Sequence, residues 1–93
     1  MFVHMGFHKN KPEAEAPLLD SMRRFGEAMK QCEGFVSVYQ LKDETTGHLV
    51  GMALWESKEH WQRAMEVCRP VIANDPFDEW EDEEPAGMTF KEV

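Results

Sequence analysis

The 93-residue sequence predicts an α+β fold of the ferredoxin-like type, in which two helices cover one face of a four-stranded antiparallel sheet. Four short segments rich in β-branched and aromatic residues are bounded by turn residues, and two longer segments repeat apolar residues at helical spacing. In chain order they read β-α-β-β-α-β. A chain of this length has room for one hydrophobic core, so we expect residues 1–93 to form a single domain.

The first third of the chain predicts a strand followed by an amphipathic helix. Residues 2–8 alternate between two sides in the manner of a strand. Pro12 or Pro17 then opens a helix over residues 13–32, because proline is tolerated in a first helical turn. The apolar residues of this segment recur at helical spacing, so one stripe faces the core, and Gly34 is a natural stop.

Two strands over residues 35–42 and 48–55 form a hairpin around a short turn that ends in Gly47. Both are apolar on both sides, whereas a sheet with one solvated face alternates apolar and polar residues. In the first strand, alternation groups Phe35, Tyr39 and Leu41 against Val36 and Val38. In the second, it groups Leu49, Ala53 and Trp55 against Val50, Met52 and Leu54. Two helices cover only one face, so we expect the other face to pack on a second copy, giving a homodimer formed sheet to sheet.

The remainder of the chain predicts a long helix, a short acidic helix and a closing strand. Ser57 is a good N-cap for the long helix, which Pro70 should end or kink at the preceding residue. Asp75 and Pro76 have the pattern of a second N-cap and proline pair, which starts the short helix. A last strand over residues 86–92 completes the sheet.

The net charge of −8, from 18 acidic and 10 basic residues, argues against nucleic-acid binding. The chain has no basic patch that would displace counterions from a phosphate backbone, and an anionic membrane surface is excluded for the same reason. No apolar run approaches the ~20 residues that cross a bilayer, and the N-terminal segment lacks the pattern of a signal peptide. We therefore expect a cytoplasmic protein that binds neither nucleic acid nor membrane.

The acidic residues are unevenly distributed. Seven lie between Asp75 and Glu84 with no basic residue among them, and the rest of the chain holds 11 acidic and 10 basic residues. Three interpretations of this acidic segment stay open: a solvated connector with Phe77 and Trp80 packed on the body, a lid in which these aromatics close a cavity, or a docking surface for a basic partner. Its charge would also disfavour anionic ligands at a nearby cavity mouth.

Two cysteines, Cys32 and Cys68, are too few for a disulfide framework and lack the spacing of a metal site. We expect two reduced, packed thiols, and the alternative is a bridge or a redox pair. The histidine and carboxylate spacings match no zinc or calcium motif, so no metal is expected.

His4 and His8 are the first candidates for acid–base chemistry near neutral pH. They fall on the same side of the first strand, about 13 Å apart at strand spacing, which is too far to share one metal ion. In one interpretation both are structural, with His4 hydrogen-bonded in the interior and His8 solvated. In the other, one of them is the base that deprotonates a phenolic substrate.

Two short motifs carry a family resemblance: Glu33-Gly34-Phe35 opens the second strand, and Leu54-Trp55-Glu56-Ser57 leads into an aromatic-bearing helix. With the strand order and size, they resemble the antibiotic-biosynthesis-monooxygenase-like family of dimeric α+β barrels over nearly the whole chain. The resemblance implies a ligand cavity between the helices and the sheet of each subunit. It also implies either oxidation of small aromatic or quinol-type substrates without a metal or flavin, heme degradation, or no catalysis at all.

The heme-degrading branch of that family can be compared position by position. In an ungapped alignment, Gly6 takes the place of its first-strand asparagine, Ala64 that of its helix tryptophan and Asn74 that of its heme-ligating histidine. All three positions depart, and Trp61 lies one helical turn early. The resemblance therefore implies a chain that works with no cofactor.

Within the cavity that the resemblance implies, aromatic and amide side chains are candidate ligand contacts. Trp55 and Trp61 would line it, Tyr39 or Asn74 would hydrogen-bond a bound oxygen, and Phe77 and Trp80 would close it. For the two helix-junction tryptophans, core packing is the alternative.

Three functions are compatible with the sequence. The first is a homodimeric, cofactor-independent monooxygenase that acts on a small apolar or aromatic substrate. The second is a non-catalytic protein that binds such a molecule on the same scaffold, and the third is a structural dimer whose interior is filled by its own side chains. A cavity of several hundred Å³ beside His4 or His8 would favour the first two.

Overall fold

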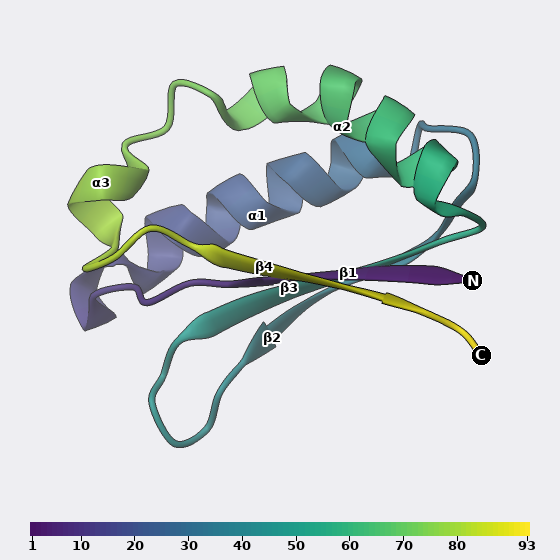
Figure 1. Ribbon diagram of the computed structural model, residues 1–93. Coiled ribbons are helices and arrows are strands. Elements are labelled where there is room, and N and C mark those ends of the chain that lie inside the picture. Colours follow the sequence, from purple (N-terminus) through teal and green to yellow (C-terminus); the bar gives the residue numbers. More distant parts are fainter.

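The computed structural model describes residues 1–93 and shows four strands with the helices packed on one side (Figure 1). In chain order the elements are β1 (Phe2–Phe7), the 3₁₀ helix η1 (Pro12–Ala14), α1 (Glu15–Met29), β2 (Phe35–Lys42), β3 (Leu49–Trp55), α2 (Lys58–Ile72), α3 (Phe77–Trp80) and β4 (Ala86–Lys91).

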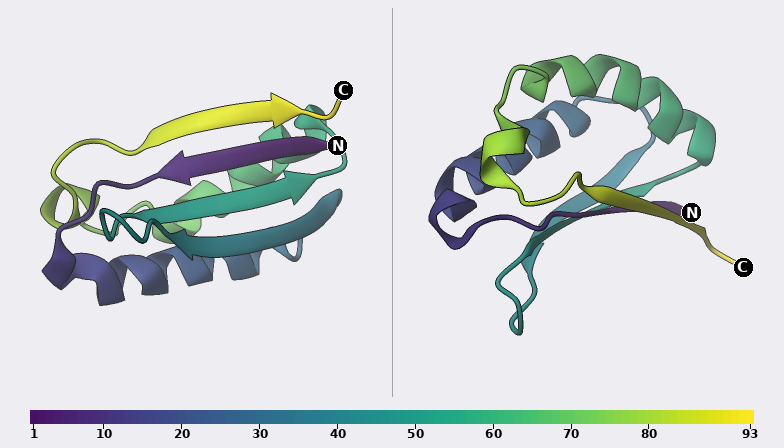
Figure 2. Two further views of the ribbon diagram at one scale, coloured as in Figure 1. Left: turned by 90° about the horizontal axis from the view of Figure 1, so that it is seen from below. Right: turned by 60° about the vertical axis from the view of Figure 1, so that its left-hand side comes forward.

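The four strands form one sheet in the order β2-β3-β1-β4, and every neighbouring pair is antiparallel. Viewed from below, the sheet is uncovered, whereas α1 and α2 lie behind it (Figure 2). We call the face beneath the helices the inner face and the bare one the outer face. The predicted ferredoxin-like fold is confirmed.

Two proline-associated predictions differ from the structure. Pro70 was expected to end or kink α2, and the predicted end is wrong: α2 continues to Ile72, because losing one backbone donor leaves the flanking turns bonded. Asp75 does not cap α3. Its carboxylate instead accepts hydrogen bonds from Ser21 Oγ and Arg24 Nη2, both at 2.6 Å, and so ties the segment after α2 to α1. The hydrogen bond from Ser21 lowers the pKa of Asp75 below its usual value, and the Arg24 guanidinium lowers it further.

The alternation expected for the second strand was also wrong. The register with β3 shifts between Phe35 and Ser37, so β2 contains a bulge at Val36. Phe35 therefore shares the inner face with Val38, and its ring meets that of Trp55 edge-on at 5.7 Å. The extra residue moves the side chains that precede it in β2 to the opposite face of the sheet. A strict alternation of residues does not predict this change.

The core lies between the helices and one half of the inner face. Its largest cluster contains Phe2, Met29, Ala53, Trp55, Ala64, Met65 and Cys68. Trp55 is fully buried, as is Cys68, whose Sγ lies 3.7 Å from that of Cys32. Both cysteines are free thiols, as expected, and burial raises the pKa of Cys68 to about 12. None of the helices combines the length and apolar character needed to cross a bilayer.

The outer face is almost wholly apolar. The pairing registers place ten large apolar side chains on it: Val3, Met5, Phe7, Tyr39, Leu41, Val50, Met52, Leu54, Met88 and Phe90. Tyr39, Met52, Met5 and Met88 form one continuous row across all four strands. The surface of an ordinary monomer carries scattered apolar residues and smaller apolar patches than this face.

Gly34, between α1 and β2, should be intolerant of any side chain. Its φ is +83°, and an added Cβ would lie 2.2 Å from Cγ of His60. Gly47 is a matched control, because its φ of +78° is similar and its Cβ would meet nothing. We expect Gly34→Ala to lower the free energy of unfolding by about 2–4 kcal/mol and Gly47→Ala by about 1 kcal/mol, as measured by denaturant titration. Equal losses would contradict the role of the contact with His60.

Candidate functional site

Three glycines lie side by side across the inner face and leave it without side chains. Gly6 of β1 pairs with Gly51 of β3 on one side and with Gly87 of β4 on the other. Directly paired residues in an antiparallel sheet point to the same face, so all three lie beneath the helices. A Cβ added at Gly6 would meet nothing within 4 Å. At Gly51 an added Cβ would lie 3.5 Å from Cε of Met22, and at Gly87 it would lie 3.2 Å from Nε2 of His4. This row, the glycine floor, is therefore open above Gly6 and flanked by Met22 and His4.

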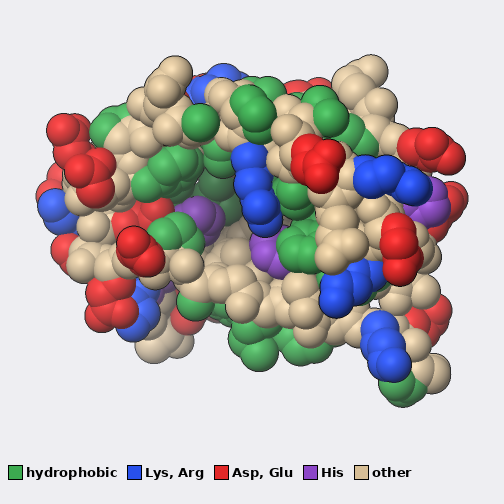
Figure 3. All heavy atoms as spheres, turned by 45° about the horizontal axis from the view of Figure 1, so that its top comes forward, with side chains coloured by type: hydrophobic (Ala, Val, Ile, Leu, Met, Phe, Trp, Pro, Cys, Tyr) green, Lys and Arg blue, Asp and Glu red, His purple; other side chains and the backbone are tan.

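A cavity of about 400 Å³ stands on the glycine floor. Its apolar walls come from α1, the end of α2 and α3, and they include Met22, Phe25, Met29, Ile72 and Phe77. On the space-filling view the surface is hollowed at this point, with histidine side chains visible inside and a basic side chain beside them (Figure 3). The volume is that of a pocket for a small organic molecule.

His8 lies on the cavity wall and is held by a buried carboxylate. Its Nδ1 is 2.9 Å from Oε1 of Glu81, whose side chain is 1% exposed. With Glu81 ionised, Nδ1 is the donor, and Nε2 is left as the free acceptor. In many acid–base catalysts a carboxylate fixes the orientation of a histidine in this way.

Backbone pairing explains why Glu81 is buried at the end of β1. Asn10 and Glu81 form an isolated antiparallel bridge, and the Asn10 side chain accepts a hydrogen bond from the backbone N–H of Leu49 at 2.9 Å. Beside them, the backbone N–H of Lys11 donates to the carbonyl of Trp80 at 2.8 Å. The segment after α3 is thus fastened to the segment after β1, which brings Glu81 to His8. The other carboxylate oxygen, Oε2, is buried without a partner.

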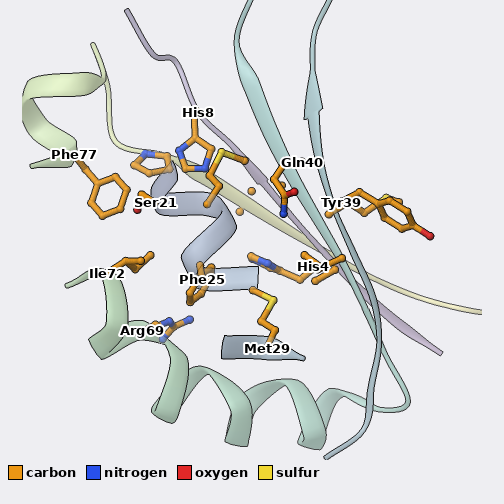
Figure 4. Close-up of a pocket in the computed structure, with 18 of the residues that line it drawn as sticks. His4, His8, Ser21, Phe25, Met29, Tyr39, Gln40, Arg69, Ile72 and Phe77 are labelled. Carbon is orange, nitrogen blue, oxygen red and sulfur yellow. The ribbon is translucent and has the colours of Figure 1, made fainter. Parts of the chain in front are cut away.

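His4 reaches the same cavity from two residues before the glycine floor (Figure 4). Its ring stacks on Trp61 with centroids 5.1 Å apart. Burial lowers the pKa of His4 below 6.5, and the positive charge of Arg69 lowers it further. The ring is therefore neutral at pH 7 and has no carboxylate partner, unlike His8.

The other predicted site residues separate into two groups. Phe77 lines the cavity, and its ring meets that of Trp80 edge-on at 5.5 Å. Trp80 itself packs on the small cluster around Leu18, and Trp61 contributes only through its stack on His4.

Three predicted contacts lie elsewhere. Trp55 is fully buried in the core, where its Nε1 has no hydrogen-bond partner, so it does not line the cavity. Asn74 is exposed on a turn. Tyr39 lies on the outer face, and its ring points away from the cavity even though its backbone borders it (Figure 4).

The acidic segment combines features of two of its expected interpretations. Phe77 and Trp80 pack on the body, as in the connector, and Phe77 also lines the cavity, as in the lid. Three of its acids are engaged: Asp75 with Arg24, Glu81 with His8, and Glu83 with Lys9. The other four, Asp78, Glu79, Asp82 and Glu84, are exposed and form no ion pair. The segment therefore borders the cavity through Phe77 and supplies the carboxylate that holds His8.

Sequence reasoning missed the glycine floor, Glu81 and Arg69. The glycines are 45 and 36 residues apart along the chain, and only the strand register brings them together. One signal was present: each of three predicted strands contains one interior glycine, where glycine is unfavourable without a reason such as close backbone approach. Glu81 carried no such signal among seven acids.

The residues do not fit heme held in the way that the heme-degrading branch implies. Asn74, at the position of the ligating histidine, carries an amide instead of an imidazole, is exposed on a turn and does not border the cavity. Nor do three or more His, Cys, Asp or Glu side chains gather closely enough to hold a metal ion.

Solved structures with this fold include three whose names bear on function. An antibiotic biosynthesis monooxygenase has a TM-score of 0.80 and 17% identity, over 100% of this chain and 99% of that one. SnoaB, a cofactor-independent oxygenase from Streptomyces nogalater, has a TM-score of 0.80 and 14% identity, over 98% and 91%. MhuD, with manganese protoporphyrin IX bound, has a TM-score of 0.78 and 15% identity, over 100% and 95%.

No protein-family model matches the sequence, and no curated protein matches it. At identities of 14–17% the structural likeness shows a shared fold. The resemblance inferred from the sequence is confirmed at that level.

Proposed function

We propose that this chain is a cofactor-independent monooxygenase that acts on a small planar aromatic substrate. The observation that carries the proposal is a cavity of about 400 Å³ that combines a glycine floor with a carboxylate-oriented histidine. A floor without side chains accepts a flat ring against the backbone, and the apolar walls favour its transfer from water. The fold shared with SnoaB supports the same reaction class.

The residues would act by making the substrate electron-rich. His8 Nε2 takes the proton of a phenolic hydroxyl, and Glu81 stabilises the imidazolium that forms. The resulting anion carries carbanion character on a ring carbon, so it can pass one electron to dioxygen, and the radical pair then joins through a new C–O bond. His8 returns the proton to the peroxide. Loss of the proton on the same ring carbon, with cleavage of the O–O bond, then releases water and leaves one oxygen atom on the ring as a carbonyl.

Oxygen uptake tests the proposal directly. A panel of naphthols and anthrones is added to the purified protein, and oxygen consumption is followed with an electrode while the product is identified by mass spectrometry. We expect oxygen to be consumed with at least one compound, and the product to contain one more oxygen atom and two fewer hydrogen atoms than that compound. Binding without oxygen consumption by any compound would instead favour the non-catalytic binding protein.

The purely structural alternative is disfavoured by the cavity itself. That alternative requires side chains of the chain to fill the interior, whereas a Cβ added at Gly6 would meet nothing within 4 Å. Interiors otherwise pack at the density of organic crystals.

The outer face supports the proposal of a homodimer packed sheet to sheet. Tyr39 and Met88, at the two ends of the row across this face, are 46% and 50% exposed in a single chain. Burying such a face against a copy of itself removes apolar area from water on both chains, which is the main driving force for association.

Met5→Glu, in the centre of the outer face, should convert the dimer to a monomer. A pair of carboxylates brought together in an apolar interface carries a desolvation penalty of several kcal/mol, so we expect at least a 100-fold weaker association. Light scattering after gel filtration at micromolar concentration measures the mass. Val67→Glu on α2, at a residue 66% exposed, is the control and should stay dimeric. A monomeric wild-type chain would contradict the dimer.

A further inference from the structure

Arg69 places an unpaired positive charge on the cavity wall. It lies in the last turn of α2, is exposed to solvent, and borders the cavity together with His4. It forms no ion pair, whereas Arg24 is held by both Asp20 and Asp75. Arg63, also on α2, is exposed and unpaired but does not border the cavity. Arg69 alone among the basic residues is therefore free to meet a ligand there.

The charges make the cavity electrically asymmetric. Figure 4 shows Arg69 and His8 on opposite sides of the cavity. The His8 side carries the buried Glu81 carboxylate, which accepts from Nδ1 of His8. His4, near Arg69, is neutral at pH 7 because burial and Arg69 lower its pKa. An anionic group is thus attracted to the Arg69 side and repelled from the Glu81 side.

The net charge of −8 does not oppose this polarity at short range. The four acids of residues 75–84 without an ion pair are exposed, so water and salt screen them over about 8–10 Å. Glu66, one helical turn before Arg69 on α2, is also exposed and forms no ion pair with it. Asp75 is paired with Arg24, and Glu81 is bonded to His8, which lies on the side of the cavity opposite Arg69. A guanidinium in direct contact with a carboxylate outweighs screened charges further away. The sequence-based expectation of neutral ligands therefore does not extend to the Arg69 side.

We infer that the cavity takes a hydroxyaryl carboxylate, with its ring on the glycine floor, its carboxylate on Arg69 and its hydroxyl at His8. This inference rests on the proposed function and names the substrate class for the same site. Guanidinium is the side chain best matched to a carboxylate, because it donates two parallel hydrogen bonds. The carboxylate would fix which end of the ring system His8 meets.

Fluorescence titration with two probes tests the assignment. The probes are 2-naphthol and 6-hydroxy-2-naphthoate, which differ by the carboxylate alone. We expect the wild-type chain to bind 6-hydroxy-2-naphthoate about tenfold more tightly, as a charge-assisted hydrogen bond at a partly solvated site would give. Arg69→Gln should remove this preference and leave the 2-naphthol affinity unchanged, whereas Arg63→Gln should keep both.

The outcomes separate this inference from the function on which it rests. Equal affinities for the two probes, or an unchanged preference in Arg69→Gln, would overturn the inference. If 2-naphthol binds and 6-hydroxy-2-naphthoate does not, Arg69 does not receive a carboxylate, yet the proposed function stands. If neither probe binds in the cavity, both proposals fail.

Discussion

Replacing His8 with glutamine should lower the oxygenation rate by about 10²–10⁴-fold, the range that a positioned general base contributes. Glutamine can still donate to Glu81, so the buried carboxylate keeps a partner and the fold is retained. It cannot take a proton from a bound phenol. Substrate affinity should change little, because the apolar walls and the glycine floor are intact. Steady-state oxygen uptake gives the rate, and fluorescence titration gives the affinity.

His48→Gln is the matched control, because His48 lies in the turn between β2 and β3 and does not border the cavity. Its rate should equal that of the wild-type chain. Glu81→Gln should also lower the rate, and the double variant His8→Gln/Glu81→Gln should be no slower than His8→Gln alone, since the two groups act as one unit. Wild-type turnover in His8→Gln would show that the base is another group.

The second large effect is expected at Gly6, the centre of the glycine floor. Because a Cβ there meets nothing within 4 Å, a phenylalanine side chain has room to enter the cavity and fill it. We expect Gly6→Phe to weaken 2-naphthol binding by about 100-fold or more, since the ring would occupy the space that the ligand needs. Its melting temperature should be no lower than that of the wild-type chain, because glycine is a poor strand residue and the added ring is buried.

Gly6→Ala gives a graded control for the same position. One methyl group fills little of a cavity of about 400 Å³. The affinity of Gly6→Ala for 2-naphthol should therefore stay within about threefold of the wild-type value, which is the usual effect of a single methylene group. Wild-type affinity in a stable Gly6→Phe variant would show that the ligand binds somewhere else.

The sequence predicted the elements well because their signals are local. Ser57 caps α2 as expected, with the backbone N–H of His60 donating to its Oγ at 3.2 Å. The hairpin and the strand order likewise follow from alternation, turn residues and the pattern of a common fold. The exceptions arise where one residue changes a regular pattern, as at the β2 bulge and at Pro70.

The candidate site was predicted only in part, because its chemistry depends on residues far apart along the chain. The two histidines on one side of β1 could be read from a period of two, and both border the cavity. Nothing local distinguishes Glu81 from its acidic neighbours, since only its bridge to Asn10 buries it. The three interior glycines were visible singly, and their common role appears only when the strands are in register.

The central claim is that an aromatic ligand binds on the glycine floor, and amide chemical-shift mapping tests it most directly. Two-dimensional ¹H–¹⁵N spectra of the labelled protein are recorded during titration with 2-naphthol, whose ring current shifts nearby amides. We expect the largest shifts at Gly6, Gly51 and Gly87, which line the cavity together, and none at Gly47 in the distant hairpin turn. Saturable shifts confined to Met52 and Met88 of the outer face, or no saturable shifts at all, would contradict the account.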